Sequence, residues 1–181
     1  DFGAKIWYDT VKAIKAKSPT CTIEILTPDF KGLNSSLDLV FSSKPDIFSH
    51  NIECVERISK KVRRTSNWER SLEVLKYSIS ENMLTKTGMM VGLGETDQEV
   101  FDTMELVQGI GVEIFNIGQY LQPTKEHLSV KRYVDPEIFK LYKQFGEKLG
   151  FKVVESGPLV RSSYHADKQA REYGKLNTLS F

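Results

Sequence analysis

Apolar and polar residues follow two periods along this chain, one typical of helices and one of short strands. Residues 5–17 place apolar side chains at helical spacing among lysines and stop before Pro19, which predicts a helix. Further helices are predicted over 33–41, after 66–69, after 96–99 and from 136 to 149. Runs rich in apolar and β-branched residues predict strands at 21–26, 46–49, 87–91, 112–117 and 151–154.

Three of these helices begin with a recognisable signal. The segments 66–69 and 96–99 read Ser-Asn-Trp-Glu and Thr-Asp-Gln-Glu. Both match the capping box, in which the first hydroxyl accepts from the third backbone N–H and the glutamate reaches back. Asp135 before Pro136 combines an N-cap residue with a proline at the first helical position.

A strand followed by a helix, repeated along the chain, predicts a parallel α/β sheet with right-handed crossovers. Four such strands precede the last one at 151–154, whose place in the sheet the pattern leaves open. A closed eight-stranded barrel needs about 250 residues, and this chain has 181. The fold is therefore an open sheet, a partial barrel or part of a longer barrel.

Composition and charge exclude several classes of function. The chain has 25 Lys and Arg against 24 Asp and Glu, so it lacks the concentrated positive field that nucleic-acid binding needs. No stretch approaches the ~20 consecutive apolar residues that span a bilayer. Cys21 and Cys54 are too few for a disulfide scaffold, or for a zinc or iron–sulfur site built from these cysteines alone. Both are interpreted as core residues.

Polar side chains gather at the predicted strand ends, where parallel α/β folds place their working residues. Four consecutive strands are followed by amide, carboxylate and hydroxyl groups, in the segments Thr27–Phe30, His50–Glu53, Gly92–Glu95 and Gly118–Thr124. This arrangement predicts a site for a polar ligand, such as a sugar or an amino-acid moiety.

Some of these residues also have a purely structural explanation. Asn51 and Glu53 are equally suited to capping the next helix. Gly92 and Gly94 lack the third glycine of a dinucleotide fingerprint and fit a tight turn better. Lys86 differs, because a lysine inside a buried strand needs a carboxylate or a ligand anion as its partner.

Asp29 and the histidines are predicted to have structural roles. Asp29 follows a proline, as turn and cap residues often do. His50, His127 and His165 lack the spacing of a zinc helix and fit no Ser–His–Asp order, which favours surface or structural positions.

Taken together, the strand-end segments and the segment after the last strand resemble the lipoyl synthases, a family of radical S-adenosylmethionine (SAM) enzymes. The matching segments are Leu26–Phe30, His50–Glu53, Lys86–Glu95, Ile117–Thr124 and Ser156–Tyr164. The last of them ends in Arg-Ser-Ser-Tyr and is the strongest. The likeness runs in order from about Asp1 to Asp167, and the ordered set is far more specific than any single motif.

The resemblance implies a partial (β/α)6 barrel of the TIM-like, radical SAM type. Residues 1–155 would form its later β/α units, and residues 156–181 would form a tail that carries the Arg-Ser-Ser-Tyr motif. It also implies two four-iron (4Fe-4S) clusters. One binds SAM and cleaves it to a 5′-deoxyadenosyl radical, and the auxiliary cluster is sacrificed as the sulfur donor. Two sulfurs are inserted into an octanoyl chain carried on a lysine of a lipoyl carrier domain.

The resemblance also implies roles for single residues, although no catalytic residue is assigned. In the family the serine before the tyrosine of Arg-Ser-Ser-Tyr ligates the auxiliary cluster, and that serine is Ser163 here. A serine oxygen is a weak iron ligand beside thiolates, which suits a labile corner. Asn51 and Glu53 suit the ribose hydroxyls or the amino-acid part of SAM. The other candidates are Lys86 for the methionine carboxylate, Glu95 and Gln119 for SAM or the acyl-lysine, and Arg161 for tying the tail to the cluster region.

This sequence departs from the family in one respect. The family's cysteine triads, Cys-x4-Cys-x5-Cys and Cys-x3-Cys-x2-Cys, precede the matched region and are absent here. The simplest expectation is a truncated chain that lacks the cluster-binding part. These 181 residues alone are then expected to hold no complete cluster and to be inactive in sulfur insertion.

The implied partners are octanoylated lipoyl carrier domains, namely the glycine cleavage H protein and the E2 subunits of 2-oxoacid dehydrogenases, together with a reducing electron donor. Neither nucleic acid nor a membrane is expected as a partner. The implied location is the cytoplasm, or the mitochondrial matrix in a eukaryote. Two other functions stay open: a non-catalytic α/β binding module derived from a radical SAM enzyme, and an unrelated barrel enzyme acting on a sugar phosphate. The second would need a phosphate-binding glycine loop near the last strands, which the sequence lacks.

Overall fold

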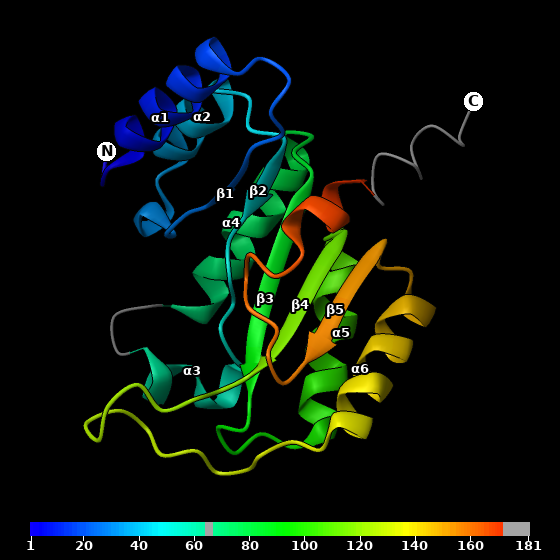
Figure 1. The fold of residues 1–181 in the computed structure, drawn as a ribbon. Coiled ribbons are helices and arrows are strands. Elements are labelled where there is room, and N and C mark those ends of the chain that lie inside the picture. The colour runs from blue at the N-terminus through cyan, green and yellow to red at the C-terminus, as the bar shows by residue number, and fades with distance from the viewer. Residues whose placement is uncertain (64–66, 172–181) are drawn as a thin grey trace.

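Five short strands form one parallel sheet in the computed structural model, which describes residues 1–63 and 67–171 (Figure 1). The strands are β1 (Glu24–Leu26), β2 (Ile47–Ser49), β3 (Thr85–Val91), β4 (Ile114–Gln119) and β5 (Val153–Gly157). They lie side by side in the order β1-β2-β3-β4-β5, and each is parallel to the next. Successive right-handed β/α units produce this order, so the fold is α/β and forms part of a TIM-like barrel.

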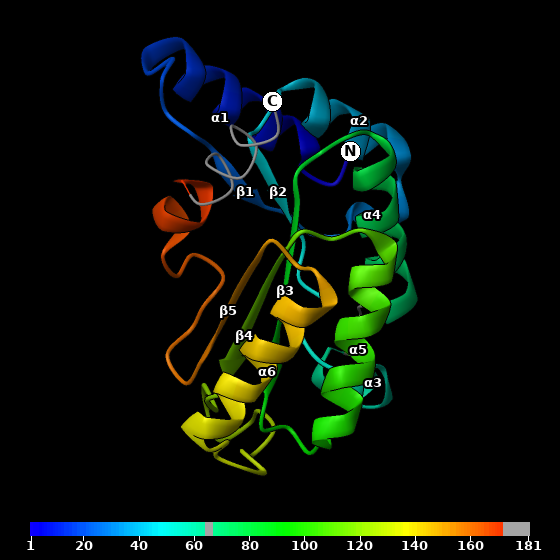
Figure 2. The same ribbon diagram turned by 90° about the vertical axis from the view of Figure 1, so that its right-hand side faces the viewer.

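Helices connect the strands and cover one face of the sheet. They are α1 (Ala4–Lys17), α2 (Asn34–Ser42), α3 (Glu56–Val62), α4 (Trp68–Ser80), α5 (Asp97–Ile110) and α6 (Pro136–Leu149), with a short 3-10 turn, η1 (Phe30–Gly32). In the view turned by 90°, α4 and α5 lie on one side of the sheet, and the orange and red segment after β5 lies on the other (Figure 2). We call the side that this segment covers the inner face.

The predicted helix starts are confirmed at α5 and α6. The Thr96 hydroxyl accepts from the Glu99 N–H at 3.2 Å, and the Glu99 carboxylate accepts from the Thr96 N–H at 2.8 Å, which completes the capping box. Asp135 caps α6 by accepting from the Glu137 N–H at 2.8 Å. At α4 the N-cap is Asn67, and Ser66, where the capping box was predicted to begin, lies outside the described residues.

Strand limits and one helix differ from the prediction. β4 and β5 begin later than expected, because Val112 and Phe151 enter the core before the strand ladder starts. β1 also begins later, at Glu24, because Cys21 and Thr22 are exposed in the segment before it. β5 pairs in parallel with β4 along its length, which settles the place of the last strand. It runs through Gly157, so the boundary expected between 155 and 156 falls inside this strand. The seven-residue helix α3 was not predicted.

The two faces of the sheet bury different kinds of side chain. The largest apolar cluster packs outward-facing residues such as Phe115 and Ile117 of β4 against the helices. The inner face carries a small apolar cluster of Ile47, Ile114 and Val153. Because side chains alternate along a strand, Asn116 and Gly118 of β4 lie on the inner face.

The expectation that both cysteines belong to the core is half right. Cys54 is buried in the main apolar cluster, whereas Cys21 is exposed. Cys21 lies ahead of β1 in the turn after α1, where its N–H donates to the Ser18 carbonyl at 3.0 Å. Across the described ranges, no helix has both the length and the apolar character that crossing a membrane requires.

Candidate functional site

A pocket of about 100 Å³ lies on the inner face of the sheet, toward the carboxyl ends of the strands. We call it the polar pocket. Its walls come from the loop after β2, from β3 and β4, and from the tail: Asn51, Glu53, Gly88, Met89, Met90, Asn116, Gly118, Val160, Arg161 and Ser162. Three of the predicted site residues, Asn51, Glu53 and Arg161, are therefore brought together, although 110 positions separate the first from the last.

The floor of the polar pocket depends on a glycine in β3. Gly88 lies between Asn51 and Asn116, and a Cβ there would lie 3.2 Å from both the Asn51 Oδ1 and the Asn116 carbonyl oxygen. Such distances are tighter than ordinary van der Waals contact. Glycine therefore leaves the two amide side chains facing a common space.

Glu53 reaches the pocket through an unusual backbone conformation. Its φ is 70°, a left-handed value that is uncommon for a residue with a side chain. Backbone bonds to β3 hold it there: the Glu53 N–H donates to the Gly88 carbonyl at 3.2 Å, and the Met90 N–H donates to the Glu53 carbonyl at 2.8 Å. Its carboxylate lies 3.5 Å from the Arg63 guanidinium. Strain of this kind is typical of functional sites.

The tail closes the polar pocket from the inner side. The Asn51 amide donates to the Ser162 hydroxyl at 3.0 Å. The Asn116 amide donates to the carbonyls of Arg161 and Ser162, each at 3.2 Å. Sequence reasoning missed Asn116, although a buried amide inside an apolar strand is the same signal that drew attention to Lys86.

Lys86 has its partner within the chain and lies outside the lining of the polar pocket. Its ammonium Nζ lies 2.9 Å and 3.0 Å from the two carboxylate oxygens of Glu24, and its side chain is 1% exposed. The carboxylate that a buried lysine requires is therefore supplied by β1.

Glu95 and Gln119 also lie outside this lining and hold loops at the strand ends. The Glu95 carboxylate accepts from the N–H groups of Gly92 and Leu93, at 2.5 Å and 3.0 Å. The Gln119 amide donates to the Arg132 carbonyl at 3.0 Å and accepts from the Val134 N–H at 2.9 Å. Both side chains are buried, so their contacts are internal.

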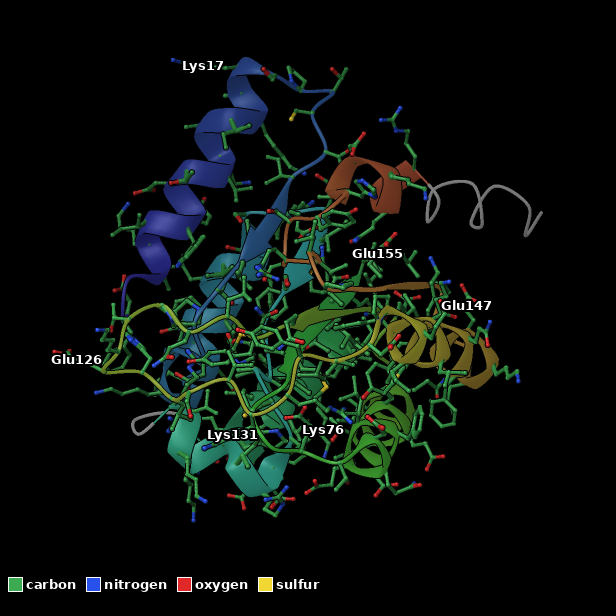
Figure 3. All side chains as sticks on the ribbon, turned by 60° about the horizontal axis from the view of Figure 1, so that its bottom comes forward. Lys17, Lys76, Glu126, Lys131, Glu147 and Glu155 are labelled. Atoms are coloured by element: carbon green, nitrogen blue, oxygen red, sulfur yellow. The ribbon has the colours of Figure 1, made fainter. Side chains whose placement is uncertain are left out.

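A larger pocket of about 630 Å³ adjoins the polar pocket, and Glu53 and Met90 line both. We call it the loop pocket. It is lined by Glu53, Lys61, Val62, Arg63, Met90, Leu93, Tyr120, Leu121, Pro123, Glu126, His127 and Leu128. Figure 3 looks onto this end of the molecule, where the loop that carries Glu126 and Lys131 crosses the strand ends. The Tyr120 hydroxyl fixes this loop by donating to the Leu128 carbonyl at 2.8 Å.

The sizes of the two pockets suggest different uses. Small-molecule sites usually have volumes of about 300–1,000 Å³. The polar pocket, at about 100 Å³, can hold only part of a ligand as large as SAM. The loop pocket, at about 630 Å³, has room for a longer group.

The residues present do not fit a complete iron–sulfur cluster. Burial raises the pKa of the Cys54 thiol to about 12, so it stays protonated, whereas iron clusters bind thiolates. In the described ranges no group of three or more His, Cys, Asp or Glu side chains could hold a metal. Ser163 is exposed, and its hydroxyl makes no hydrogen bond within the described part of the chain. It is therefore available as a single ligand.

The structural roles predicted for Asp29 and His50 are confirmed. Asp29 caps η1 by accepting from the Lys31 N–H at 3.0 Å and pairs with Arg70 at 2.6 Å. The ring of His50 bonds to the Thr27 carbonyl at 2.9 Å and to the Ser71 hydroxyl at 3.0 Å. Burial lowers the pKa of His50, which keeps the ring neutral.

A parallel β/α sheet in sequence order, with polar side chains at the carboxyl ends of its strands, is the framework of barrel-type enzymes. The chain belongs to the radical SAM superfamily, whose sequence profile matches residues 3–107.

The resemblance to lipoyl synthases is also confirmed. The chain is 48% identical to the lipoyl synthase of Flavobacterium psychrophilum, 46% to that of Treponema denticola and 48% to the mitochondrial lipoyl synthase of Nematostella vectensis. Each match covers 93% of this chain. The chain spans 58% of the length of each of these three relatives.

Proposed function

We propose that this chain forms the later β/α units and the tail of a lipoyl synthase, which inserts two sulfur atoms into an octanoyl chain on a lipoyl carrier domain. The observation that carries the proposal is the convergence of Asn51, Glu53 and the Arg-Ser-Ser-Tyr tail on the polar pocket. The identity of about 48% to lipoyl synthases supports it.

SAM is the cofactor that the polar pocket suits best. The Asn51 amide and the Glu53 carboxylate offer a donor and an acceptor for ribose hydroxyls or for the amino-acid end of SAM. When bound, SAM supplies the radical chemistry of the superfamily. Lys86, Glu95 and Gln119 stabilise the strands and loops around the site and do not contact SAM, because their polar groups bond to other groups of the chain.

The loop pocket suits the octanoyl chain. Its walls include apolar side chains such as Val62, Leu93 and Leu128, and it opens directly beside the polar pocket. Burial of each methylene there would contribute about 0.8 kcal/mol to binding. The partners are the octanoylated H protein or E2 subunits and a reducing electron donor, in the bacterial cytoplasm or the mitochondrial matrix.

Two four-iron clusters are part of this proposal, with Ser163 as the only cluster ligand that we assign to this chain. The 181 residues alone are proposed to be inactive, because their thiols cannot bind a complete cluster. Iron and sulfide analysis of this chain after anaerobic reconstitution should find neither in stoichiometric amount. Stoichiometric clusters with turnover would contradict this part of the proposal.

The activity is tested with the complete gene product that contains this chain and an octanoyl-lysine peptide. Mass spectrometry should detect a product with two added sulfurs. Ser163→Ala should abolish that product while largely sparing SAM cleavage, whereas Ser35→Ala, an exposed serine in α2, should change neither. If Ser163→Ala lowers SAM cleavage and sulfur insertion equally, the role assigned to Ser163 is wrong. If the unaltered protein forms no lipoyl product, the proposed activity is wrong.

A second candidate is a non-catalytic binding module derived from a radical SAM enzyme, because the polar pocket is lined by residues of this chain alone. Such a module would use the same polar pocket without iron. Tight SAM binding by a complete gene product that contains no iron would support the module and exclude the synthase.

A further inference from the structure

Two residues of β4 on the inner face, Asn116 and Gly118, contact the tail. A Cβ on Gly118 would overlap the carbonyl oxygen of Val160, so the tail backbone can approach β4 only where a side chain is missing. Two positions earlier on the same face, Asn116 is 3% exposed and donates to two consecutive tail carbonyls, those of Arg161 and Ser162. One residue supplies space and the other supplies hydrogen bonds.

The tail is also anchored at residues that follow Ser163 in the sequence. Gln169 is fully buried, and its amide donates to the Tyr164 carbonyl at 2.9 Å and to the Asn116 Oδ1 at 3.4 Å. Next to it, Ala170 packs against the inner apolar cluster. Asn116 therefore contacts the tail both before and after Ser163, and the red segment in Figure 2 lies against the inner face as these contacts require.

The two serines of the motif differ in their bonding. The Ser162 hydroxyl accepts from the Asn51 amide, and its carbonyl accepts from Asn116. Ser163 follows directly and is exposed, with a hydroxyl that makes no hydrogen bond within the described ranges. Ser162 therefore anchors the turn, and Ser163 is exposed to solvent.

We propose that Asn116 and Gly118 form a seat on β4 that positions the Arg-Ser-Ser-Tyr turn, and with it the hydroxyl of Ser163. Asn116 is a positioning residue: it acts on Ser163 through the two carbonyls that precede it. The consequence for sulfur insertion rests on the proposed function, but the seat itself does not. It is a property of the chain without cofactor or substrate.

The seat is tested in the 181-residue chain by hydrogen–deuterium exchange. Asn116→Leu keeps the approximate shape of the side chain but removes both N–H donors without adding a charge, and Gly118→Ala adds one methyl group where the tail lies. Each should speed amide exchange in residues 158–171 by about tenfold to a hundredfold, while protection of β3 and β4 persists. The matched control is Gly157→Ala, the register partner of Gly118, because a Cβ there meets the Val160 side chain at an ordinary 3.5 Å.

A spin label reports on residue 163 directly. In a Cys21→Ser background, which removes the exposed thiol, a nitroxide on Ser163→Cys should give an ordered spectrum. The spectrum should become mobile when Asn116→Leu or Gly118→Ala is added and stay ordered with Gly157→Ala. Persistent exchange protection of β3 and β4 in the same variants distinguishes release of the tail from a loss of overall stability.

Two results would overturn the seat. One is exchange that rises equally in the sheet and in residues 158–171, which would make Asn116 and Gly118 general stabilisers of the sheet. The other is unchanged exchange and label mobility in both variants. Neither measurement involves iron, SAM or turnover, so failure of the seat is distinguishable from failure of the proposed activity.

Discussion

The buried ion pair between Lys86 and Glu24 makes a quantitative prediction about stability. The Lys86 side chain is 1% exposed and that of Glu24 is 16% exposed. Removing one partner of a buried pair leaves an uncompensated charge, at a cost of about 3–5 kcal/mol. Glu24→Gln leaves Lys86 fully buried and should lower the free energy of unfolding by that amount. Lys86→Met leaves the more accessible Glu24, which water partly rehydrates, and should cost about 2–3 kcal/mol.

The double variant separates the pair from the packing around it. Lys86→Met with Glu24→Leu replaces both charges by apolar groups of similar size, which is often neutral in a buried pair. Its free energy of unfolding should lie within about 1 kcal/mol of that of the parent. This is well above the value expected if the losses of the two single variants were additive. The exposed pair Lys5–Asp9 is the control, and Lys5→Met there should have a much smaller effect than either buried variant.

Urea denaturation followed by circular dichroism measures all four variants, with the slope of the transition checked for a common two-state mechanism. Additive losses in the double variant would refute the reasoning, because they would mean that the two charges do not stabilise one another. Single losses below about 1 kcal/mol would refute it as well, because the charges would then be hydrated in the folded chain.

Four further predictions concern two glycines, one histidine and the two cysteines. Gly109→Ala should raise the free energy of unfolding by about 0.5–1 kcal/mol, because Gly109 is in helix α5 and its added Cβ meets nothing within 4 Å. Gly92→Ala should lower the free energy of unfolding by about 2 kcal/mol or more, since the φ of Gly92 is 99° and the methyl group would overlap the Gln119 amide. A higher urea midpoint for Gly92→Ala than for Gly109→Ala would contradict both predictions. Below pH 6.5, the ordinary pKa of histidine, His50 takes up a proton in the unfolded chain but stays neutral where it is buried in the folded chain. The free energy of unfolding should therefore fall as the pH drops, and it should fall less steeply in His50→Gln. A parallel fall in both proteins would assign the effect to other groups. A thiol reagent at neutral pH should label only Cys21 in the folded chain, because Cys54 is buried and its pKa is raised to about 12. Mass spectrometry should count one label in buffer and two in denaturant. Two labels in buffer would refute the burial of Cys54.

Local sequence was sufficient for the elements and the fold class. The periodicity of apolar residues predicts α1, α5 and the strand cores, and the capping box at Thr96 is confirmed, because such signals act over a few neighbouring residues. The starts of the strands differ from the prediction. Val112 and Phe151 look like strand residues but belong to the core before the ladder begins. Apolar character alone does not distinguish these two environments.

The candidate site was predicted only in part. The motifs led to Asn51, Glu53 and Arg161, and the structure brings these three to one pocket. Asn116 was missed, because its neighbours made the segment look like an ordinary buried strand. Cys21 was assigned to the core on its residue type, but the turn after α1 leaves it exposed.

The sequence by itself determined that Lys86 needs an anionic partner, that the strands are parallel, and that polar groups collect at their ends. Only the tertiary structure decided which partner each group meets. Glu24 is 62 positions from Lys86, and the carbonyl of Arg161 is 45 positions from Asn116. Strand register and the alternation of side chains between the two faces of the sheet bring Lys86 next to Glu24. The path of the tail across the inner face brings the Arg161 carbonyl to Asn116. Both depend on contacts between segments far apart in the chain, and a local pattern of residues carries no record of them.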